Sequence, residues 1–281
     1  MRTPKRPRRR VRLPAALSLA GMAILAVLVG YVLGQVLLNA VLGRAEEEVP
    51  AQAPSGEPAQ TPATPSTPTT ARVDVMLPSF ALYRVQLGAF SNRDNAQNLA
   101  ADAQARGFPA YVTPGPLYRV VVGYFSSKAA SEPLVSRLEK QGYEVYVGAT
   151  ELASGVISLQ GDKEYLQALK SVVEGLSAFV RDQAAWWDAY WSHGSGLTEG
   201  ARKLVEDARG INQEILSVTA SAGWTGTQEE LASLAQLAVQ VAVEIEALAA
   251  QRSTQHLVMG GSAFVELVEK LNAFCMSLAE H

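Results

Sequence analysis

The stretch Tyr83-Arg84-Val85-Gln86-Leu87-Gly88-Ala89-Phe90-Ser91 decides the fold of part of this chain, because it recurs 35 positions later as Tyr118-Arg119-Val120-Val121-Val122-Gly123-Tyr124-Phe125-Ser126. The match continues in phase beyond these openings through three further pairs: Leu99 and Leu134, Gly107 and Gly142, and Tyr111 and Tyr146. Each copy opens with alternating polar and apolar residues, continues with helical spacing, and closes with a short apolar stretch before a turn. The sequence therefore predicts a duplicated βαββαβ domain over residues 79–149.

The two copies resemble the SPOR (sporulation-related repeat) domain family. The residues that carry the resemblance are the two openings, the first of which has the pattern V-Q-x-G-x-F-S, and Ala96, Leu99 and Gly107. The resemblance covers about a quarter of the chain. It implies an α+β fold with a four-stranded antiparallel sheet backed by two helices. It also implies binding to peptidoglycan, specifically to glycan strands stripped of their stem peptides, which accumulate at division septa.

Strand alternation selects the candidate binding residues. Residues two apart in a strand share a face, which groups the even positions from Arg84 to Phe90 and the odd positions from Arg119 to Phe125. A guanidinium and an amide can hydrogen-bond sugar hydroxyls and acetamides. The candidate glycan-binding residues, with the family pattern included, are Arg84, Gln86, Phe90, Ser91, Arg119 and Phe125.

Three alternatives stand beside this assignment. Gln86 is also compatible with a solvated sheet position, and core positions suit Phe90 and Phe125 better than ligand contact does. The assignment of faces fails if a bulge precedes Phe90. Val121 occupies the position in the second copy that Gln86 occupies in the first, so any site is expected to be asymmetric.

The N-terminal region predicts a membrane anchor. Seven basic residues lie within positions 1–12, and residues 13–43 form an uncharged apolar run that is long enough to span a bilayer. The positive-inside rule places the basic tail in the cytoplasm and everything after Arg44 outside a bacterial cell membrane. Cleavage as a secretory signal is the alternative. Residues 44–78 are rich in Pro, Thr and Ala, which predicts a disordered linker.

Charge argues against nucleic acid as a partner. The net charge of the chain is -3, and the basic residues concentrate in the N-terminal tail, so the remainder is acidic. The single cysteine excludes an internal disulfide framework. No cofactor, metal site or catalytic group is predicted, because the histidines lack metal-ligand spacing and the acidic residues are scattered along predicted helix surfaces.

Residues 150–281 predict an all-α domain. Four amphipathic segments follow one another, the first starting near Asp162 and the third after a capping box formed by Thr227 and Glu230. Gly260-Gly261 is expected to break the chain before the last helix. Four such helices can close a bundle, with an elongated or partner-completed array as the alternative. The exposed side of Trp186, Trp187 and Trp191 is a candidate contact for an envelope protein.

Two classes of function fit these observations. The first is a non-catalytic, single-pass membrane protein that binds peptidoglycan in bacterial division or sporulation. The alternative is a cell-wall hydrolase whose catalytic domain is the helical region.

Overall fold

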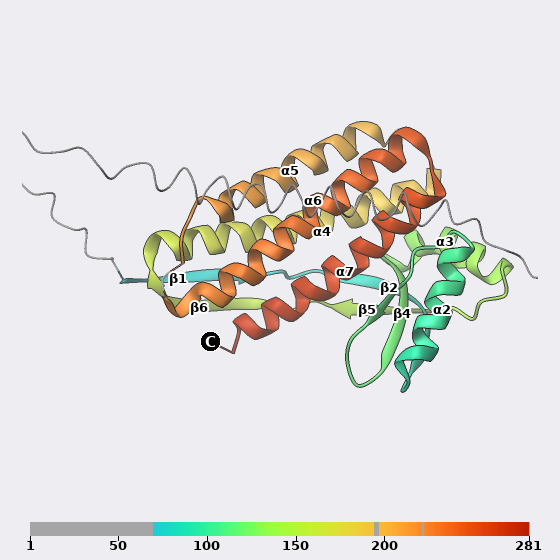
Figure 1. Cartoon of the computed structure of the whole chain (residues 1–281), viewed down its shortest axis with the longest axis horizontal. Helices are drawn as coiled ribbons and strands as arrows, with labels where there is room; N and C mark the ends of the chain where they lie inside the picture. The colour runs from blue at the N-terminus through green and yellow to red at the C-terminus, as the bar shows by residue number, and fades with distance from the viewer. Residues whose placement is uncertain (1–69, 194–196, 221, 281) are drawn as a thin grey trace, which may run out of the picture. The chain divides into compact units, whose positions relative to one another are not determined.

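The computed structural model describes residues 70–193, 197–220 and 222–280. The predicted basic tail 1–12, the anchor 13–43 and residues 44–69 of the linker lie outside this range. The elements, in chain order, are β1 (Thr70–Leu77), β2 (Ala81–Phe90), α2 (Arg93–Ala105), β3 (Tyr111–Thr113), β4 (Tyr118–Phe125), α3 (Lys128–Lys140), β5 (Tyr146–Glu151), β6 (Gly155–Asp162), α4 (Lys163–His193), α5 (Thr198–Leu216), a 3-10 turn (Ala222–Trp224), α6 (Thr225–Gln251) and α7 (Thr254–Leu278) (Figure 1).

The duplicated region forms the predicted four-stranded antiparallel sheet. The strand order is β3-β4-β2-β5, so the opening strands of the two copies, β2 and β4, pair at the centre. Helices α2 and α3 contact these strands from one side. The predicted βαββαβ order is therefore confirmed, and its core includes Val85, Val120, Phe125, Leu134 and Leu138.

The same local signals begin and end the two helices. The Asn92 side chain caps α2 by accepting hydrogen bonds from two backbone N–H groups of the first turn, and Ser127 caps α3 in the same way through one. Gly107 and Gly142 follow the two helix ends with φ of 85° and 86°. Glycine adopts this left-handed conformation without steric cost, so each helix stops at the matching repeat position.

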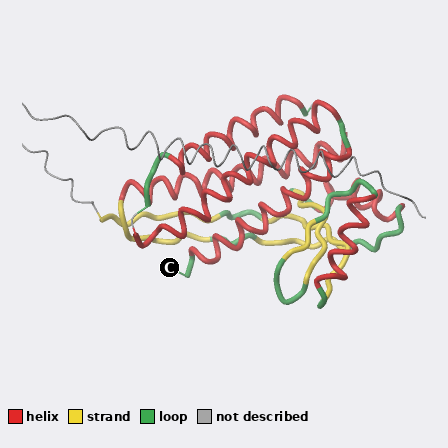
Figure 2. The backbone as a smooth tube through the Cα atoms, in the orientation of Figure 1, coloured by secondary structure: helices red, strands yellow, loops and turns green. Residues whose placement is uncertain are grey.

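A second, two-stranded sheet departs from the prediction. Strand β1 pairs antiparallel with β6 from Thr70 opposite Asp162 to Leu77 opposite Gly155. Residues 70–77 are therefore a strand rather than the end of a disordered linker, and the region after residue 150 is not all helical. The reason is a tertiary contact. Strand β1 packs on α4, with Val75 and Leu77 buried, and its partner β6 follows the duplicated domain in the sequence. We call the β1–β6 pair the ribbon, and Figure 2 shows it beside the helices.

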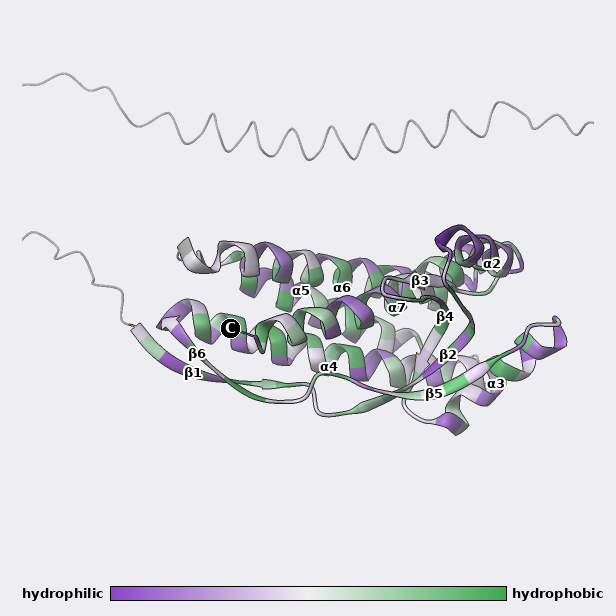
Figure 3. Ribbon diagram, turned by 90° about the horizontal axis from the view of Figure 1, so that it is seen from below, coloured by the Kyte–Doolittle hydropathy of each residue, from purple (hydrophilic) through white to green (hydrophobic). Residues whose placement is uncertain are grey.

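Helices α4, α5, α6 and α7 form the helical region that the sequence predicted. Neighbouring helices contact each other along the order α4-α5-α6-α7. Hydrophobic residues lie along all four in Figure 3, whereas α2 is mostly hydrophilic. The start predicted near Asp162 is confirmed, because its side-chain Oδ1 accepts a hydrogen bond from the backbone N–H of Tyr165 at 2.9 Å. Helix α6 begins at Thr225, upstream of the predicted cap at Thr227.

The break predicted at Gly260-Gly261 is wrong, because both glycines lie inside α7 and are buried. A Cβ atom at Gly261 would lie 2.4 Å from Cγ of Pro109. The glycine therefore lets the helix approach the chain just before β3 instead of ending the helix.

Among the residues that the structure describes, α6 alone has the length and apolar composition of a membrane span. Eight of its residues are buried, from Leu231 to Leu248, and it contacts α5 and α7 along its length. These contacts fit a central helix of a packed bundle.

Candidate functional site

The central pair of strands contains an irregularity that decides which side chains point to which face of the sheet. The register of β2 against β4 shifts between Val85 and Gln86 and again between Gln86 and Gly88. Leu87 and Val122 have no counterpart in this register. A bulge of this kind reverses the alternation of side chains along each strand.

Two glycines show the reversal directly. A Cβ atom at Gly88 would lie 3.4 Å from Leu99 of α2, and one at Gly123 would lie 3.6 Å from Leu134 of α3. Val85 pairs with Gly123, so it points toward the helices as well. The sheet face on α2 and α3 thus takes odd positions before the bulge of β2 and even positions after it. We call this the helix face and the opposite one the distal face.

The predicted assignment of the two phenylalanines to the ligand face is therefore wrong. Phe90 and Phe125 lie on the helix face, where their rings pack over Gly88 and Gly123. Phe125 is fully buried and Phe90 is half-buried against the core. Ser91 lies past the end of β2, exposed in the turn before α2. The bulge separates these residues from Arg84 and Gln86.

The other three predicted residues share the distal face. Arg84 and Gln86 lie two apart in a regular pairing with β5, and the residue between them points to the helix face. Arg119 pairs with Ala89, which neighbours the helix-facing Gly88. All three predicted side chains are half-buried. The structure therefore brings together the guanidinium and amide groups that strand alternation selected.

Tyr146 belongs to this face and was missed by the sequence reasoning. It pairs with Gln86, and its side chain is 63% exposed. A Cβ atom at Gly148 would lie 2.9 Å from the Tyr146 ring, so the ring covers that glycine. Its match with Tyr111 in the repeat was the available signal. Gln86, Arg119 and Tyr146, with the exposed Ala89, form what we call the open end of the distal face.

The remainder of the distal face lies under α7, and we call it the covered end. It contains Val121 and Tyr124, which are buried, and the half-buried Tyr111. Helix α7 contacts both β3 and β4, the strands that carry these residues. The Nε of Arg84, the residue paired with Tyr124, is buried and has no hydrogen-bond partner.

The covered end is shaped by two glutamates of α7. The Tyr124 hydroxyl donates a hydrogen bond to Oε1 of Glu269. Burial, and then the Glu269 carboxylate, raise the pKa of Tyr124, so its phenol remains a donor at neutral pH. Burial also raises the pKa of Tyr111, with further contributions from Glu266 and Glu269. Both phenols therefore face carboxylates at this end.

A second polar contact joins the end of β4 to α4. Asp188 accepts hydrogen bonds from the backbone N–H of Ser126 at 3.2 Å and from the Ser126 hydroxyl. Burial raises the pKa of Asp188, and these two hydrogen bonds oppose the shift. The second copy of the repeat thus contacts both α4 and α7.

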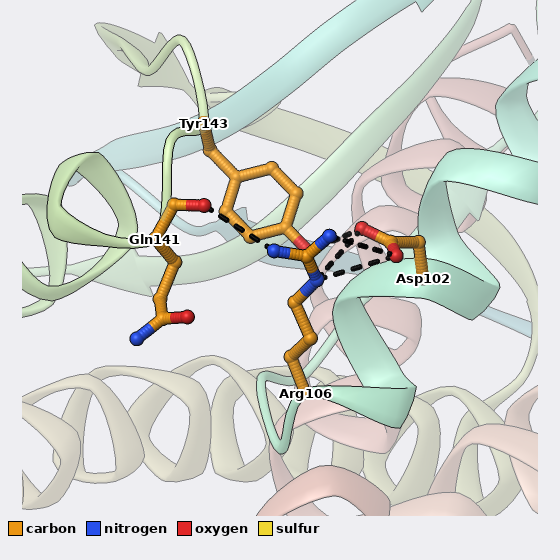
Figure 4. A network of polar contacts seen from close by, with 4 residues as sticks. All are labelled: Asp102, Arg106, Gln141 and Tyr143. Atoms are coloured by element: carbon orange, nitrogen blue, oxygen red, sulfur yellow. Dashed lines mark hydrogen bonds and ion pairs between the residues drawn. The ribbon is translucent and has the colours of Figure 1, made fainter.

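The two repeat copies are also joined to each other where their helices end (Figure 4). Arg106 donates a hydrogen bond to the backbone oxygen of Gln141 at 3.3 Å, and it pairs with Asp102 at 3.2 Å. The Tyr143 hydroxyl donates to Asp102 at 2.6 Å. The pKa of Asp102 is lowered chiefly by this Tyr143 hydrogen bond. The network lies among the helix ends and holds α2 and α3 together.

The tryptophan cluster is not a docking surface. Trp186, Trp187 and Trp191 are 5%, 3% and 5% exposed, so the predicted contact through their exposed side is wrong. Tyr190 stacks on Trp186 with ring centroids 5.5 Å apart, and Arg137 of α3 lies over the Trp191 ring at 5.2 Å. The cluster therefore fills the junction of α4 with its neighbours.

No group of three His, Cys, Asp or Glu side chains is placed to hold a metal ion within the described ranges. Cys275 is buried, and burial raises the pKa of its thiol to about 12, which makes it a poor nucleophile.

Comparison with known proteins finds two matches to the duplicated region. Residues 80–148 match the model of the SPOR domain family. The solution structure of the peptidoglycan binding domain of the B. subtilis cell wall lytic enzyme CwlC is 39% identical in sequence, with a TM-score of 0.25. That match covers 26% of this chain and 94% of the CwlC domain. A search of curated proteins finds no match.

Proposed function

Because residues 80–148 of this chain belong to the SPOR domain family, we propose that the protein binds peptidoglycan through the distal face of that domain. The ligand is the glycan strand stripped of its stem peptides. The observation that carries the proposal is the meeting of Gln86, Arg119 and Tyr146 at the open end of the distal face. The CwlC domain, which is 39% identical, is described as peptidoglycan binding.

The chemistry of the open end suits a sugar polymer. The Gln86 amide can both donate to and accept from hydroxyl and acetamide groups, and the Arg119 guanidinium donates several hydrogen bonds. The exposed Tyr146 ring offers a flat apolar surface for the face of a sugar ring. Removal of a stem peptide by an amidase leaves a free carboxylate on the lactyl group, and a guanidinium pairs well with a carboxylate. Stripped glycan thus offers the Arg119 guanidinium a carboxylate that intact wall lacks.

A binding assay on intact and stripped wall tests the proposal. The full chain is incubated with purified peptidoglycan before and after amidase treatment, and the sedimented fraction is measured. We expect stronger binding to the treated wall. Gln86→Ala and Arg119→Ala should each weaken binding about fivefold, because a typical hydrogen bond contributes about 1 kcal/mol. Tyr146→Ala should weaken it as well, through loss of the sugar-stacking surface.

Matched controls separate loss of a contact from general damage. Gln97 is exposed on α2 and Arg202 is exposed on α5, away from the distal face. Gln97→Ala and Arg202→Ala should leave binding unchanged. Equal binding to intact and amidase-treated wall, or equal losses in the controls, would contradict the stated ligand.

We further propose that the protein is a non-catalytic, single-pass membrane protein acting in bacterial division or sporulation. The basic tail 1–12 and apolar run 13–43 support the anchor. A cysteine introduced between residues 45 and 69 should react with an impermeant reagent in intact cells, and reaction only after lysis would reverse the topology.

A peptidoglycan zymogram tests the proposal that the protein is non-catalytic. A cleared band at the size of the chain would establish the hydrolase instead.

A further inference from the structure

Helix α7 packs on α6 and also contacts strands β3 and β4 of the SPOR domain. Its polar residues Ser262, Glu266, Glu269 and Asn272 are spaced by three or four positions, which places them on one side of a helix. Three of the four make direct hydrogen bonds to residues between 110 and 153. Within this polar stripe, Ser262 and Glu269 therefore face the duplicated domain, and Asn272 faces the segment between β5 and β6.

The contacts of the stripe are specific. Oγ of Ser262 accepts a hydrogen bond from the backbone N–H of Ala110 at 3.0 Å. Oδ1 of Asn272 accepts one from the backbone N–H of Ala153 at 2.7 Å. Glu269 accepts one from Tyr124 between these two points. Satisfied hydrogen bonds at three places along a helix specify its register on the residues beside it.

The helix lies where the ligand face continues. The covered end of the distal face, with Tyr111, Val121 and Tyr124, belongs to the same sheet surface as the open end. A glycan strand is a polymer, so a strand that lies along the distal face contacts both the open end and the covered end. While α7 is in place, only the open end can be occupied.

The charge that α7 supplies resembles that of the ligand. Glu269 brings a carboxylate to the covered end, and Glu266 brings a second one that is paired with Lys270 at 2.7 Å. The lactyl groups of stripped glycan are also carboxylates. Arg84 also lies at this end, where its side chain interacts with Tyr124 and its buried Nε has no hydrogen-bond partner. The Glu269 carboxylate therefore lies where a carboxylate of the ligand would meet the covered end.

We propose that α7 is a built-in competitor of the glycan strand: docked on the covered end it limits the SPOR domain to partial contact with the wall, and its release exposes the full distal face. This inference rests on the proposed function. It predicts that the apparent affinity for stripped glycan is lowered by the fraction of molecules in which α7 is docked.

Two opposed variants of the full chain test the proposal. The opening variant combines Ser262→Ala, Glu269→Ala and Asn272→Ala, which removes the three hydrogen bonds of the stripe. Its matched control combines Glu229→Ala, Glu230→Ala and Gln240→Ala at exposed positions of α6. The locking variant combines Ala110→Cys with Ser262→Cys and Cys275→Ala, so that oxidation joins α7 to the chain just before β3.

We expect the opening variant to bind stripped glycan several-fold more tightly than the original chain, and the control to bind as the original chain does. The locked, oxidised variant should bind several-fold more weakly than the same variant after reduction. The comparison of one variant in two redox states needs no assumption about folding of a different sequence. Circular dichroism and thermal unfolding confirm that each form is folded.

The outcomes distinguish the two proposals. If the oxidised and reduced forms bind equally and the opening variant matches the original chain, docking of α7 does not compete with glycan, while the proposed function stands. If no form binds stripped glycan, with the reduced and opening variants folded, the proposed function is wrong and the competitor role falls with it. Added Gln86→Ala should reverse the gain of the opening variant, and a gain that persists would place the new binding on another surface.

Discussion

The two copies of the repeat build the same strand-helix-strand unit, yet their distal-face residues meet different surroundings. Gln86 in the first copy lies half-buried at the open end, whereas its counterpart Val121 is fully buried. Tyr146 is 63% exposed, whereas its counterpart Tyr111 lies half-buried near the glutamates of α7. A duplicated domain offers two equivalent surfaces, and in this chain the C-terminal helices occupy one of them. The repeat has a polar side chain, Gln86, where the face is open and an apolar one, Val121, where the face is covered.

Of the changes that exchange the matching residues Gln86 and Val121, the one at Val121 should produce the largest effect. Val121→Gln places an amide in a fully buried position that an apolar side chain now fills. We expect the free energy of unfolding to fall by about 2–3 kcal/mol, because a buried polar group without a partner costs about that much. Urea unfolding of the full chain measures the change. A loss below about 0.5 kcal/mol, which is typical of surface positions, would show that Val121 is not covered.

The reciprocal change sharpens the comparison, because it should separate binding from stability. Gln86→Val gives the first copy the residue of the second. We expect the free energy of unfolding to change by less than about 0.5 kcal/mol, as at other partly exposed positions. Affinity for stripped glycan should fall about fivefold with the loss of one hydrogen bond. If Gln86→Val destabilises the protein as much as Val121→Gln, the two halves are equally covered and the asymmetry is wrong.

The two glycines of the helix face should differ by a smaller amount. A Cβ atom would lie 2.9 Å from the Phe90 ring at Gly88 and 3.1 Å from the Phe125 ring at Gly123. Phe90 is half-buried and can turn away, whereas Phe125 is fully buried. We expect Gly123→Ala to cost about 1–2 kcal/mol through overpacking and Gly88→Ala to cost less. Thermal unfolding compares the two, and a larger loss for Gly88→Ala would show that Phe90 is the more tightly held ring.

The contact between the two copies at Tyr143 should have the smallest effect, and it depends on pH. The Tyr143 hydrogen bond lowers the pKa of Asp102 below its ordinary value of 3.8. A carboxyl group with a lowered folded-state pKa contributes stability above the unfolded-state pKa and loses it as pH falls through the folded-state pKa. Tyr143→Phe should therefore lower the Tm slightly near pH 6, and the difference should shrink below pH 3.8. A difference that is constant between pH 6 and pH 2.5 would mean that the ring, and not its hydroxyl, carries the effect.

Much of the fold could be predicted because its signals are local. The duplicated openings, the caps at Asn92 and Ser127, and the glycines that end both helices each act within a few residues. The faces of the sheet could not be assigned by alternation, because one bulge reverses every later side chain in its strand. For the same reason the candidate site was predicted in part: Arg84, Gln86 and Arg119 share the distal face, and the two phenylalanines do not.

The remaining differences come from contacts between distant parts of the chain. Strand β1 pairs only with β6, a segment that follows the SPOR domain in the sequence. Gly260 and Gly261 suit a turn when neighbours are unknown, but Gly261 lies inside α7 against Pro109. The contact with an envelope protein predicted for the tryptophans is wrong, because all three are buried between α4 and its neighbours. A local sequence pattern holds no information about the distant residues that a segment contacts. It therefore predicts a helix or a strand but not what that helix or strand packs against.

The ribbon has a consequence for how the chain folds as it is synthesised. Leu77 and Gly155 are paired neighbours, so the whole SPOR domain emerges from the ribosome between the two strands. Its own strands and helices lie close together in the sequence and can fold as soon as they appear. Strand β1, synthesised before all of them, has no partner until β6 follows, and the ribbon packs on a helix that comes later still. The first described strand to be made is therefore among the last to be fixed, and a nascent chain that stops before β6 carries a finished wall-binding domain with an unpaired strand at its entrance.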